Sequence, residues 1–229
     1  MFEYKEKGHK YFLDGKPMTG VTTILGVIAK PALIQWAANM AVDYAIENAI
    51  DKGTQDEVPY YTINADTLKQ ARTAHAKKKT DAGKKGTDVH ALCEDWIKTG
   101  ALPEEPNEQF ANFTEWVKTE NIKVLESEKR MYHPDLFIAG TCDLVFEKDG
   151  KKYVGDIKTS SGIYYEAFIQ MAGYQIMLEQ MGEKFDGYCV VNLRKDGKME
   201  VQYRYDMETD KGAFMAALTL YRAINTYKI

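Results

Sequence analysis

Residues 140–160, GTCDLVFEKDGKKYVGDIKTS, place three ionisable side chains on two strands of one predicted hairpin. Asp143 lies in the first strand, and Asp156 and Lys158 lie in the second. Successive side chains of a strand alternate between its faces, so Asp156 and Lys158 point to one side and Ile157 points to the other. The residues around them are mostly apolar, as in strands that are buried on both faces. Two carboxylates and an ammonium group are therefore expected to converge within a sheet.

Carboxylates gathered in an apolar setting call for a cation, because unpaired buried charge is costly. A hard divalent ion such as Mg2+ binds oxygen ligands, and Asp143, Asp156 and a backbone carbonyl would supply three. Such an ion acidifies water and neutralises charge on a phosphate, and the neighbouring Lys158 would orient the nucleophile or stabilise the transition state. This pattern indicates phosphodiester hydrolysis. The alternative is an exposed hairpin with solvated charges that turns at Asp149 and Gly150.

Composition favours one soluble globular domain with extensions. The chain has 229 residues, 45% of them hydrophobic and 28% charged. The N-terminus lacks the apolar segment of a signal peptide, and no run of eighteen apolar residues occurs, so a cytoplasmic location without membrane attachment is expected. The cysteines Cys93, Cys142 and Cys189 are odd in number and far apart, which argues against a disulfide framework and a zinc ribbon.

Local charge departs from the overall balance. The net charge of −4 argues against a chain coated for nucleic acid over its whole surface. Between residues 69 and 85, however, the chain has seven basic residues and a single acidic residue, Asp81. Such a cluster is either a phosphate-binding surface or an ordinary solvated helix face. The seven are Lys69, Arg72, Lys77, Lys78, Lys79, Lys84 and Lys85.

The order of predicted elements indicates an α/β fold with a mixed sheet and helices on both of its faces. An aromatic hairpin over residues 1–17 and a short helical turn at 21–26 come first. Residues 51–64 are expected to form a loop, and Gly83 and Gly86 are expected to break a helix. Further helices are expected at about 31–50, 65–82, 87–100, 107–120, 164–181 and 211–227. Strands are expected at about 123–132, 138–147, 152–159, 187–193 and 199–205.

Four motifs in this order resemble the PD-(D/E)XK nuclease superfamily, in its RecB-like exonuclease branch. They are His90 in GTDVH, Asp143 in the G-x-x-D form of the acidic motif, the D-x-K motif of Asp156 and Lys158, and Gln170 with Tyr174 as Q-x-x-x-Y. The N-terminal HKYFLDGKPMTGVTTIL is similar to the start of phage-encoded members and of the mitochondrial genome maintenance exonuclease. The proline that usually precedes the first acid is absent.

The resemblance implies a restriction-endonuclease-like αβββαβ core at 86–229, preceded by a substrate-guiding hairpin and helical extension at 1–85. It implies that Asp143, Asp156, the Ile157 carbonyl and His90 bind Mg2+ or Mn2+, and that Lys158 is catalytic. The cysteines that hold an iron–sulfur cluster in some relatives are absent, so no cluster is expected. Residues expected to support the site or contact DNA are Gln170, Tyr174, Glu128, Lys77, Lys78, Lys84 and Lys85.

The expected activity is that of a metal-dependent DNA exonuclease acting on single strands or DNA ends. A structure-specific endonuclease is the first alternative, and a DNA-binding or assembly protein without cleavage is the second. The similarity to phage proteins suggests the host cytoplasm, and a role in recombination, replication or repair with a protein partner from those processes. Oligomeric state, cleavage polarity and the choice between DNA and RNA are left open by the sequence.

Overall fold

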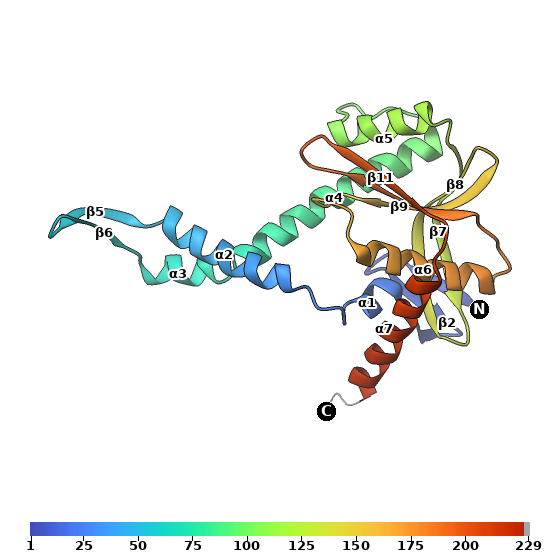
Figure 1. Ribbon diagram of the computed structural model, residues 1–229, viewed down its shortest axis with the longest axis horizontal. Coiled ribbons are helices and arrows are strands. Elements are labelled where there is room, and N and C mark those ends of the chain that lie inside the picture. The colour runs from blue at the N-terminus through green and yellow to red at the C-terminus, as the bar shows by residue number, and fades with distance from the viewer. Residues whose placement is uncertain (227–229) are drawn as a thin grey trace. The chain divides into compact units, whose positions relative to one another are not determined.

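A mixed β-sheet forms the centre of the fold. The computed structural model describes residues 1–226, apart from the side chain of Thr87 (Figure 1). The strands of the sheet are β4 (Thr19–Gly20), β7 (Lys123–His133), β8 (Ile138–Lys148), β9 (Lys151–Lys158), β10 (Gly187–Leu193) and β11 (Met199–Arg204). Their order is β11-β10-β9-β8-β4, and β7 also pairs with β8. β9 and β10 are parallel, as are β4 and β8, whereas the other pairs are antiparallel.

The β8–β9 pair is the predicted hairpin. Its turn consists of Asp149 and Gly150, whose φ angles are 52° and 72°. Two successive residues with positive φ match the twist of the flanking strands, which is why Asp-Gly favours this connection. β9 then pairs with β10, a strand whose residues are all buried. Because β9 lies between β8 and β10, its residue Asp156 is removed from bulk water.

Helices cover both faces of the sheet (Figure 1). One hydrophobic cluster joins the sheet to α1 (Val21–Leu25), α6 (Tyr165–Gln180) and α7 (Glu208–Thr226). A second cluster joins the opposite face to α5 (Glu108–Thr119) and to the later part of α4 (Ala74–Thr99). Asn107 caps α5 by accepting a hydrogen bond from the Phe110 amide at 2.8 Å. The α/β class with an αβββαβ core, predicted from the sequence, is confirmed by these elements.

The N-terminal strands pack with the sheet. β1 (Phe2–Lys5), β2 (Lys10–Leu13) and β3 (Lys16–Pro17) form a small antiparallel sheet. The Tyr11 hydroxyl lies 2.9 Å from the Thr141 hydroxyl of β8, and β4 pairs with the first residues of that strand. Residues 1–28 therefore belong to one compact unit with the described residues from Asp88 onward, which we call unit 1. The expected division at residue 85 places them with the helical extension instead.

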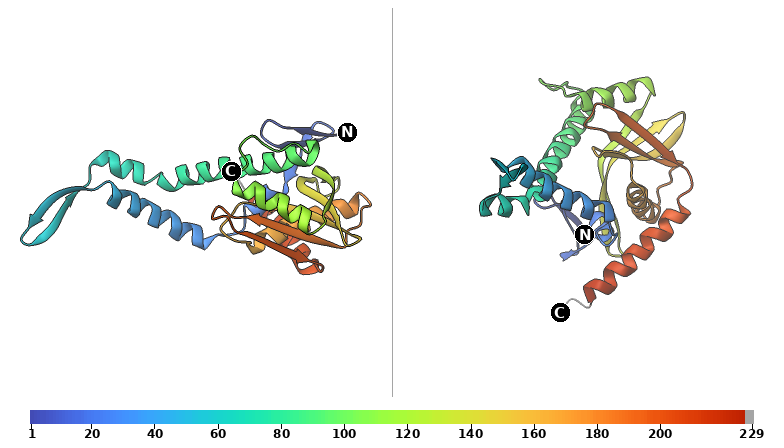
Figure 2. Two further views of the ribbon diagram at one scale, coloured as in Figure 1. Left: turned by 90° about the horizontal axis from the view of Figure 1, so that it is seen from above. Right: turned by 60° about the vertical axis from the view of Figure 1, so that its left-hand side comes forward.

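Ala29–Thr87 form a second compact unit, unit 2. Within it, α2 (Pro31–Glu47) lies beside α3 (Ala65–Ala71) and the first part of α4 (Figures 1 and 2). The Tyr44 hydroxyl donates a hydrogen bond to Gln70 Oε1 at 2.5 Å, and the Trp36 ring meets the His75 ring edge-on. The antiparallel strands β5 (Ile50–Gln55) and β6 (Val58–Thr62) connect α2 to α3.

Three local predictions are wrong. The helix expected at about 65–82 is interrupted, since α3 ends at Ala71 and α4 begins at Ala74. Residues 51–64 were expected to be a loop, but they form most of the β5–β6 hairpin, which turns at Asp56 and Glu57 with φ of 50° and 66°. A turn of this kind usually contains glycine, so the sequence signal is weak. The expected break at Gly83 and Gly86 is absent, because α4 continues through both glycines. The expected end of the last helix at residue 227 lies outside the described residues. No helix in the described part of the chain has the length and apolar character needed to cross a membrane.

Candidate active site

The β8–β9 hairpin places Asp143 and Asp156 on neighbouring strands. Leu144 pairs with Gly155, so the register brings the next residue pair, Asp143 and Asp156, opposite each other. Asp143 Oδ2 accepts a hydrogen bond from the Ile157 amide at 2.6 Å. Asp156 is 2% exposed, and its Oδ2 is paired with the Lys158 ammonium. The two carboxylates therefore share one site, in which Asp156 is buried and the Asp143 side chain is 16% exposed.

Burial and the neighbouring carboxylate make ionisation of Asp143 unfavourable. The pKa of Asp143 is raised well above its usual range by burial and by the neighbouring Asp156 carboxylate, against the opposing effects of Lys158 and the Ile157 amide. A bound cation would remove the repulsion and favour the ionised form. The charge state of the site thus depends on what binds beside the two carboxylates.

Lys158 lies between Asp156 and the helix that covers this face of the sheet. Its Nζ is 2.5 Å from Asp156 Oδ2 and donates a hydrogen bond to Gln170 Oε1 at 3.1 Å. Burial lowers the pKa of Lys158, but the Asp156 and Asp143 carboxylates outweigh it, so the pKa is raised and the amine stays protonated. The expectation that Asp156 and Lys158 point the same way is confirmed by this contact.

Gln170 and Tyr174 support the site from α6. The Gln170 amide nitrogen donates to Asp156 Oδ1 at 3.2 Å and to the Tyr174 hydroxyl at 2.6 Å. Both residues are buried, so neither is an exposed polar residue of the helix surface. A Cβ atom on Gly140 would lie 2.8 Å from Tyr174 Cε1, so glycine allows the tyrosine ring to pack against β8. α6 therefore holds Asp156 and Lys158 in one arrangement through a single amide side chain.

His90 reaches the same site from α4. Its Nδ1 lies 3.7 Å from Asp143 Oδ2. Burial lowers the pKa of His90, against the opposing effect of Asp156, so the ring is neutral at pH 7. A neutral imidazole is the form that binds metal ions. The structure thus brings His90 together with Asp143, Asp156 and Lys158, which are distant from it in sequence.

Glu128 adds another carboxyl group near Asp143. It lies in β7 between Ser127, which pairs with Leu144, and Lys129, which pairs with Cys142. Its φ of 51° is left-handed, which is uncommon for a residue inside a strand. Burial, Asp143 and Glu94 raise its pKa to about 7.

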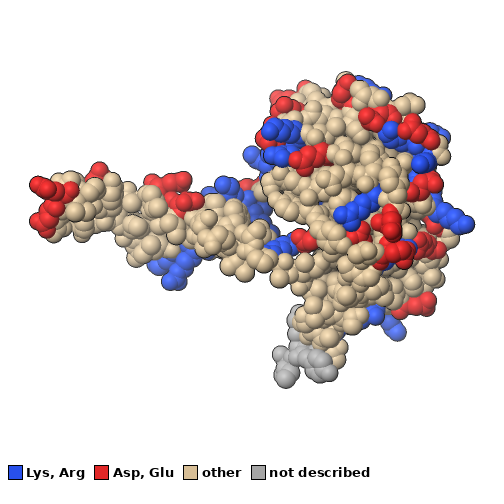
Figure 3. Space-filling view, in the orientation of Figure 1, with Lys and Arg blue, Asp and Glu red and all other residues tan. Residues whose placement is uncertain are grey.

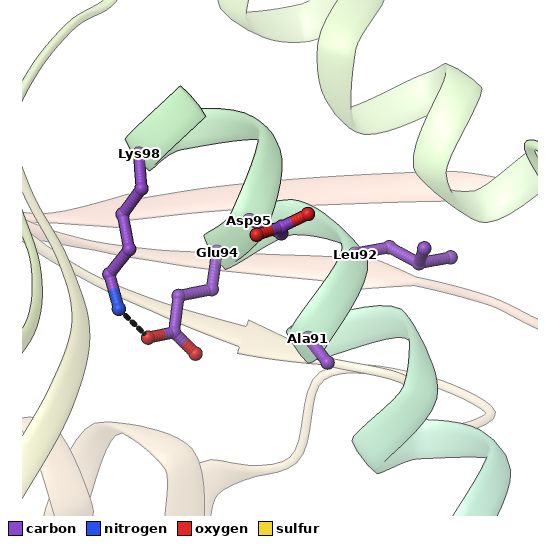
Figure 4. Close-up of a pocket in the computed structure, with 5 residues that line it drawn as sticks. All are labelled: Ala91, Leu92, Glu94, Asp95 and Lys98. Carbon is purple, nitrogen blue, oxygen red and sulfur yellow. Dashed lines mark hydrogen bonds and ion pairs between the residues drawn. The ribbon is translucent and has the colours of Figure 1, made fainter. Parts of the chain in front are cut away.

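Glu94 lies one helical turn after His90 and lines a pocket on α4 (Figure 4). Its carboxylate pairs with Lys98, and both side chains extend to the same side of the helix. The other lining residues are Ala91, Leu92 and Asp95. None of the predicted site residues lines this pocket. The spacing of four residues, which puts His90 and Glu94 on one face of the helix, is the sequence signal for Glu94.

Asn192 is a further residue that sequence reasoning missed. It is fully buried and lies opposite Lys158 in the β9–β10 ladder. Its side-chain oxygen accepts a hydrogen bond from the Ser160 amide at 3.0 Å and thereby fixes the chain directly after Lys158. A single asparagine in an apolar strand, GYCVVNL, was the signal that marked it.

The predicted basic residues Lys77, Lys78, Lys84 and Lys85 are exposed and belong to unit 2, whereas the carboxylates belong to unit 1. Whether they contact DNA stays a prediction.

The donor set fits a hard divalent cation. Asp143 and Asp156 present carboxylate oxygens from neighbouring strands, and the Ile157 carbonyl belongs to the same strand as Asp156. Mg2+ is commonly held by one or two carboxylates while it retains several waters. Among the described residues, no group of three or more His, Cys, Asp or Glu side chains is arranged to hold a metal ion. His90 as an additional ligand therefore stays a prediction.

Comparisons with known proteins give similarities to solved structures alone. No family model matches the chain, and no curated protein matches it. An alkaline exonuclease, LHK-Exo from Laribacter hongkongensis, is 14% identical over 91% of this chain and 92% of its own, with a TM-score of 0.40. A phage-related exonuclease from Haemophilus somnus 129PT is 13% identical over 90% of this chain and 93% of its own, with a TM-score of 0.33. The structure of SSO0001 is 17% identical over 49% of this chain and 57% of its own, with a TM-score of 0.32.

Proposed function

We propose that this protein is a metal-dependent deoxyribonuclease that degrades single strands or strand ends as an exonuclease. The observation that carries this proposal is the pair of carboxylates, Asp143 and Asp156, that face each other within the sheet, with the Lys158 ammonium 2.5 Å from Asp156 Oδ2. Such grouped charges destabilise an apolar sheet unless a cation binds them. A purely structural protein has no need of this arrangement. The ordered motifs of the RecB-like branch support DNA as the substrate.

Asp143, Asp156 and the Ile157 carbonyl would hold Mg2+ or Mn2+, which would act as a Lewis acid on the scissile phosphate and lower the pKa of bound water. Lys158 is protonated, so it acts as a hydrogen-bond donor and a positive charge. In this role it orients the nucleophile or stabilises negative charge on the phosphate oxygens in the transition state. Gln170 fixes the position of the Lys158 Nζ and so prevents the amine from turning away.

His90 would add a nitrogen ligand to the two carboxylates. Imidazole suits Mn2+ better than Mg2+, so activity with both ions and a preference for Mn2+ are expected. Titrating each ion into metal-free protein by calorimetry tests this independently of activity. Equal affinities for the two ions would remove the argument for His90 as a ligand.

One set of reactions tests the proposed function. Linear single strands labelled at the 5′ or 3′ end, and a closed single-stranded circle, are incubated with Mn2+, Mg2+ or EDTA. We expect progressive loss of the linear strands with either ion, intact circles, and no reaction in EDTA. Cut circles would favour the endonuclease. Unchanged linear strands with bound Mn2+ would favour a DNA-binding protein without cleavage.

A further inference from the structure

Unit 2 lacks a hydrophobic core of its own. Ala71 is its single buried residue among the described side chains of Ala29–Thr87. Units of this size normally depend on burying most of their apolar surface. In unit 2, large apolar side chains are exposed instead. They are Leu33, Ile34, Val42, Ile46, Ile50, Val58, Tyr60, Tyr61, Ile63 and Leu68.

The helix α2 is apolar on two sides. Trp36, Met40 and Tyr44, spaced by four residues, contact His75, Lys78 and Gln70 of α3 and α4. A second row, Ile34, Ala38, Val42 and Ile46, is exposed, with Ile34 at 75% and Ile46 at 66%. A surface helix normally has one apolar stripe, whereas α2 has two, and its polar row is Gln35, Asn39, Asp43 and Glu47. The second row therefore indicates a contact with another molecule.

Charge is segregated along unit 2 (Figure 3). The part around the β5–β6 hairpin is acidic, and the part along the end of α3 and the start of α4 is basic. The acidic part carries Asp43, Glu47, Asp51, Asp56, Glu57 and Asp66 against Lys52. The basic part carries Lys69, Arg72, Lys77, Lys78, Lys79, Lys84 and Lys85 against Asp81. The acidic part thus has a net charge of −5 (1 − 6), and the basic part has +6 (7 − 1).

We propose that unit 2 binds unit 2 of a second copy of this chain in an antiparallel arrangement. A two-fold axis places the acidic part of each copy on the basic part of the other, and it places the exposed rows of α2 against each other. The nearly equal and opposite charges match this self-complementary pairing. DNA fits the surface less well, because the acidic part would repel phosphates.

The first test is the mass of the full chain in solution. Sedimentation velocity at about 1 to 100 μM protein should show a monomer–dimer equilibrium, since affinities in this range are typical of small interfaces. Raising NaCl from about 0.1 M to about 1 M should weaken the dimer several-fold, because salt screens exposed charge pairs. A monomer at every concentration would overturn the proposal.

Charge reversal tests the pairing itself. Asp43→Lys with Glu47→Lys reverses part of the acidic end, and Lys84→Glu with Lys85→Glu reverses part of the basic end. All four side chains are exposed. Each double variant alone should raise the dimer Kd at least tenfold, because like charges then meet. An equimolar mixture of the two should form a mixed dimer, and a chain that carries all four changes should dimerise again.

The apolar row is tested by Ile34→Ser, with Leu102→Ser as its matched control. Leu102 is 71% exposed and lies outside unit 2. Ile34→Ser should weaken the dimer at least tenfold, whereas Leu102→Ser should not change it. Circular dichroism of each variant at a concentration where all are monomeric checks that the fold is kept.

Two further results would contradict the proposal. A dimer that persists in every unit 2 variant would place the interface elsewhere. A monomeric wild type whose affinity for a labelled single strand falls in the Lys84→Glu and Lys85→Glu variant would assign the basic part to DNA.

Discussion

The Asp143 and Asp156 carboxylates show how one residue pair couples protonation, folding and metal binding. Both belong to one hairpin, and together with the half-buried Lys158 they form a site whose charges do not balance. The amine offsets part of the negative charge. The remaining negative charge is neutralised either by a proton on a carboxylate or by a bound cation, and these two compete.

This competition predicts the pH dependence of stability. The pKa of Asp143 is raised, and that of Glu128 is raised to about 7, so the folded state holds their protons more tightly than the unfolded state does. Metal-free protein should therefore be most stable below the unfolded pKa values and should lose stability as pH rises through about 7. Thermal unfolding in EDTA from pH 5 to pH 8.5 measures this.

Mn2+ should reverse the trend, raising Tm more at pH 8 than at pH 6, because the ion binds the ionised pair. Asp143→Asn should raise the Tm of metal-free protein at pH 8 and abolish the response to Mn2+. An Asn variant that still gains stability from Mn2+ would exclude Asp143 as a ligand.

Lys158→Ala should lower the cleavage rate by about 100- to 10,000-fold, the range for a group that acts directly on a transition state. Mn2+ affinity should not fall, since the amine is a cation beside the ligands. The matched control is Lys151→Ala, an exposed lysine at the start of the same strand. Cleavage at the parent rate by Lys158→Ala would show that the amine has no catalytic role.

At the scale of single residues, the sequence predicted most of the side chains that meet at the site. The residues that it missed were missed for a physical reason. Strand alternation gave Asp156 and Lys158, and the ordered motifs added His90 and Gln170. Asn192 and Glu94 were missed, because their relation to the site depends on strand pairing and helix placement. The left-handed backbone at Glu128 also has no signal in the side-chain pattern.

Among the helices, α6 connects the site to the packed core. It contacts β7, β8, β9 and β10, and it carries Gln170 and Tyr174. Its contact with α7 is close at one point, where a Cβ atom on Gly173 would lie 2.7 Å from the buried Phe214 ring. The position of α6 over the sheet thus depends on the absence of a side chain.

Gly173→Ala should lower the free energy of unfolding by about 1–3 kcal/mol, because Phe214 is buried and cannot move without cost. Gly212→Ala in α7 is the control, since nothing lies within 4 Å of its added Cβ. That change should instead raise stability by about 0.5–1 kcal/mol, as expected for alanine in a helix. Urea denaturation measures both. Equal effects at the two positions would contradict the close packing.

Element prediction succeeded where the hydrophobic period was strong. The buried strands and the amphipathic helix α5 follow directly from their sequences. It failed in unit 2, where the β5–β6 hairpin has no alternation of buried and exposed residues, because every residue of β5 is exposed. Gly83 and Gly86 also do not end α4, since glycine lowers helix stability without forbidding the helix.

For the whole molecule, the two units differ in what stabilises them. Unit 1 contains the buried clusters on both faces of the sheet, whereas Ala71 is the single buried residue among the described side chains of unit 2. The sequence did not predict this difference, because apolar residues are abundant in both. Whether an apolar side chain is buried depends on contacts between distant segments.

Hydrogen exchange should resolve the two units. At a concentration where the protein is monomeric, amides of Ala29–Thr87 should exchange far faster than those of β8, β9 and β10, because regions with few buried contacts open at low cost. Mass spectrometry of peptides after timed exposure to D2O measures the difference. Equal protection in both units would show that unit 2 is stabilised by contacts within one chain.

The turn at Asp149 and Gly150 has a consequence for how this site tolerates changes in chain length. The two acids face each other because equal numbers of residues run back from the turn on each arm. Adding one residue to a single arm would send one acid to the opposite side of the sheet, whereas adding one to both arms would keep them facing. An insertion beside this turn is thus tolerated only if the other arm gains one residue as well. The short connection between β8 and β9 therefore tolerates insertions and deletions poorly.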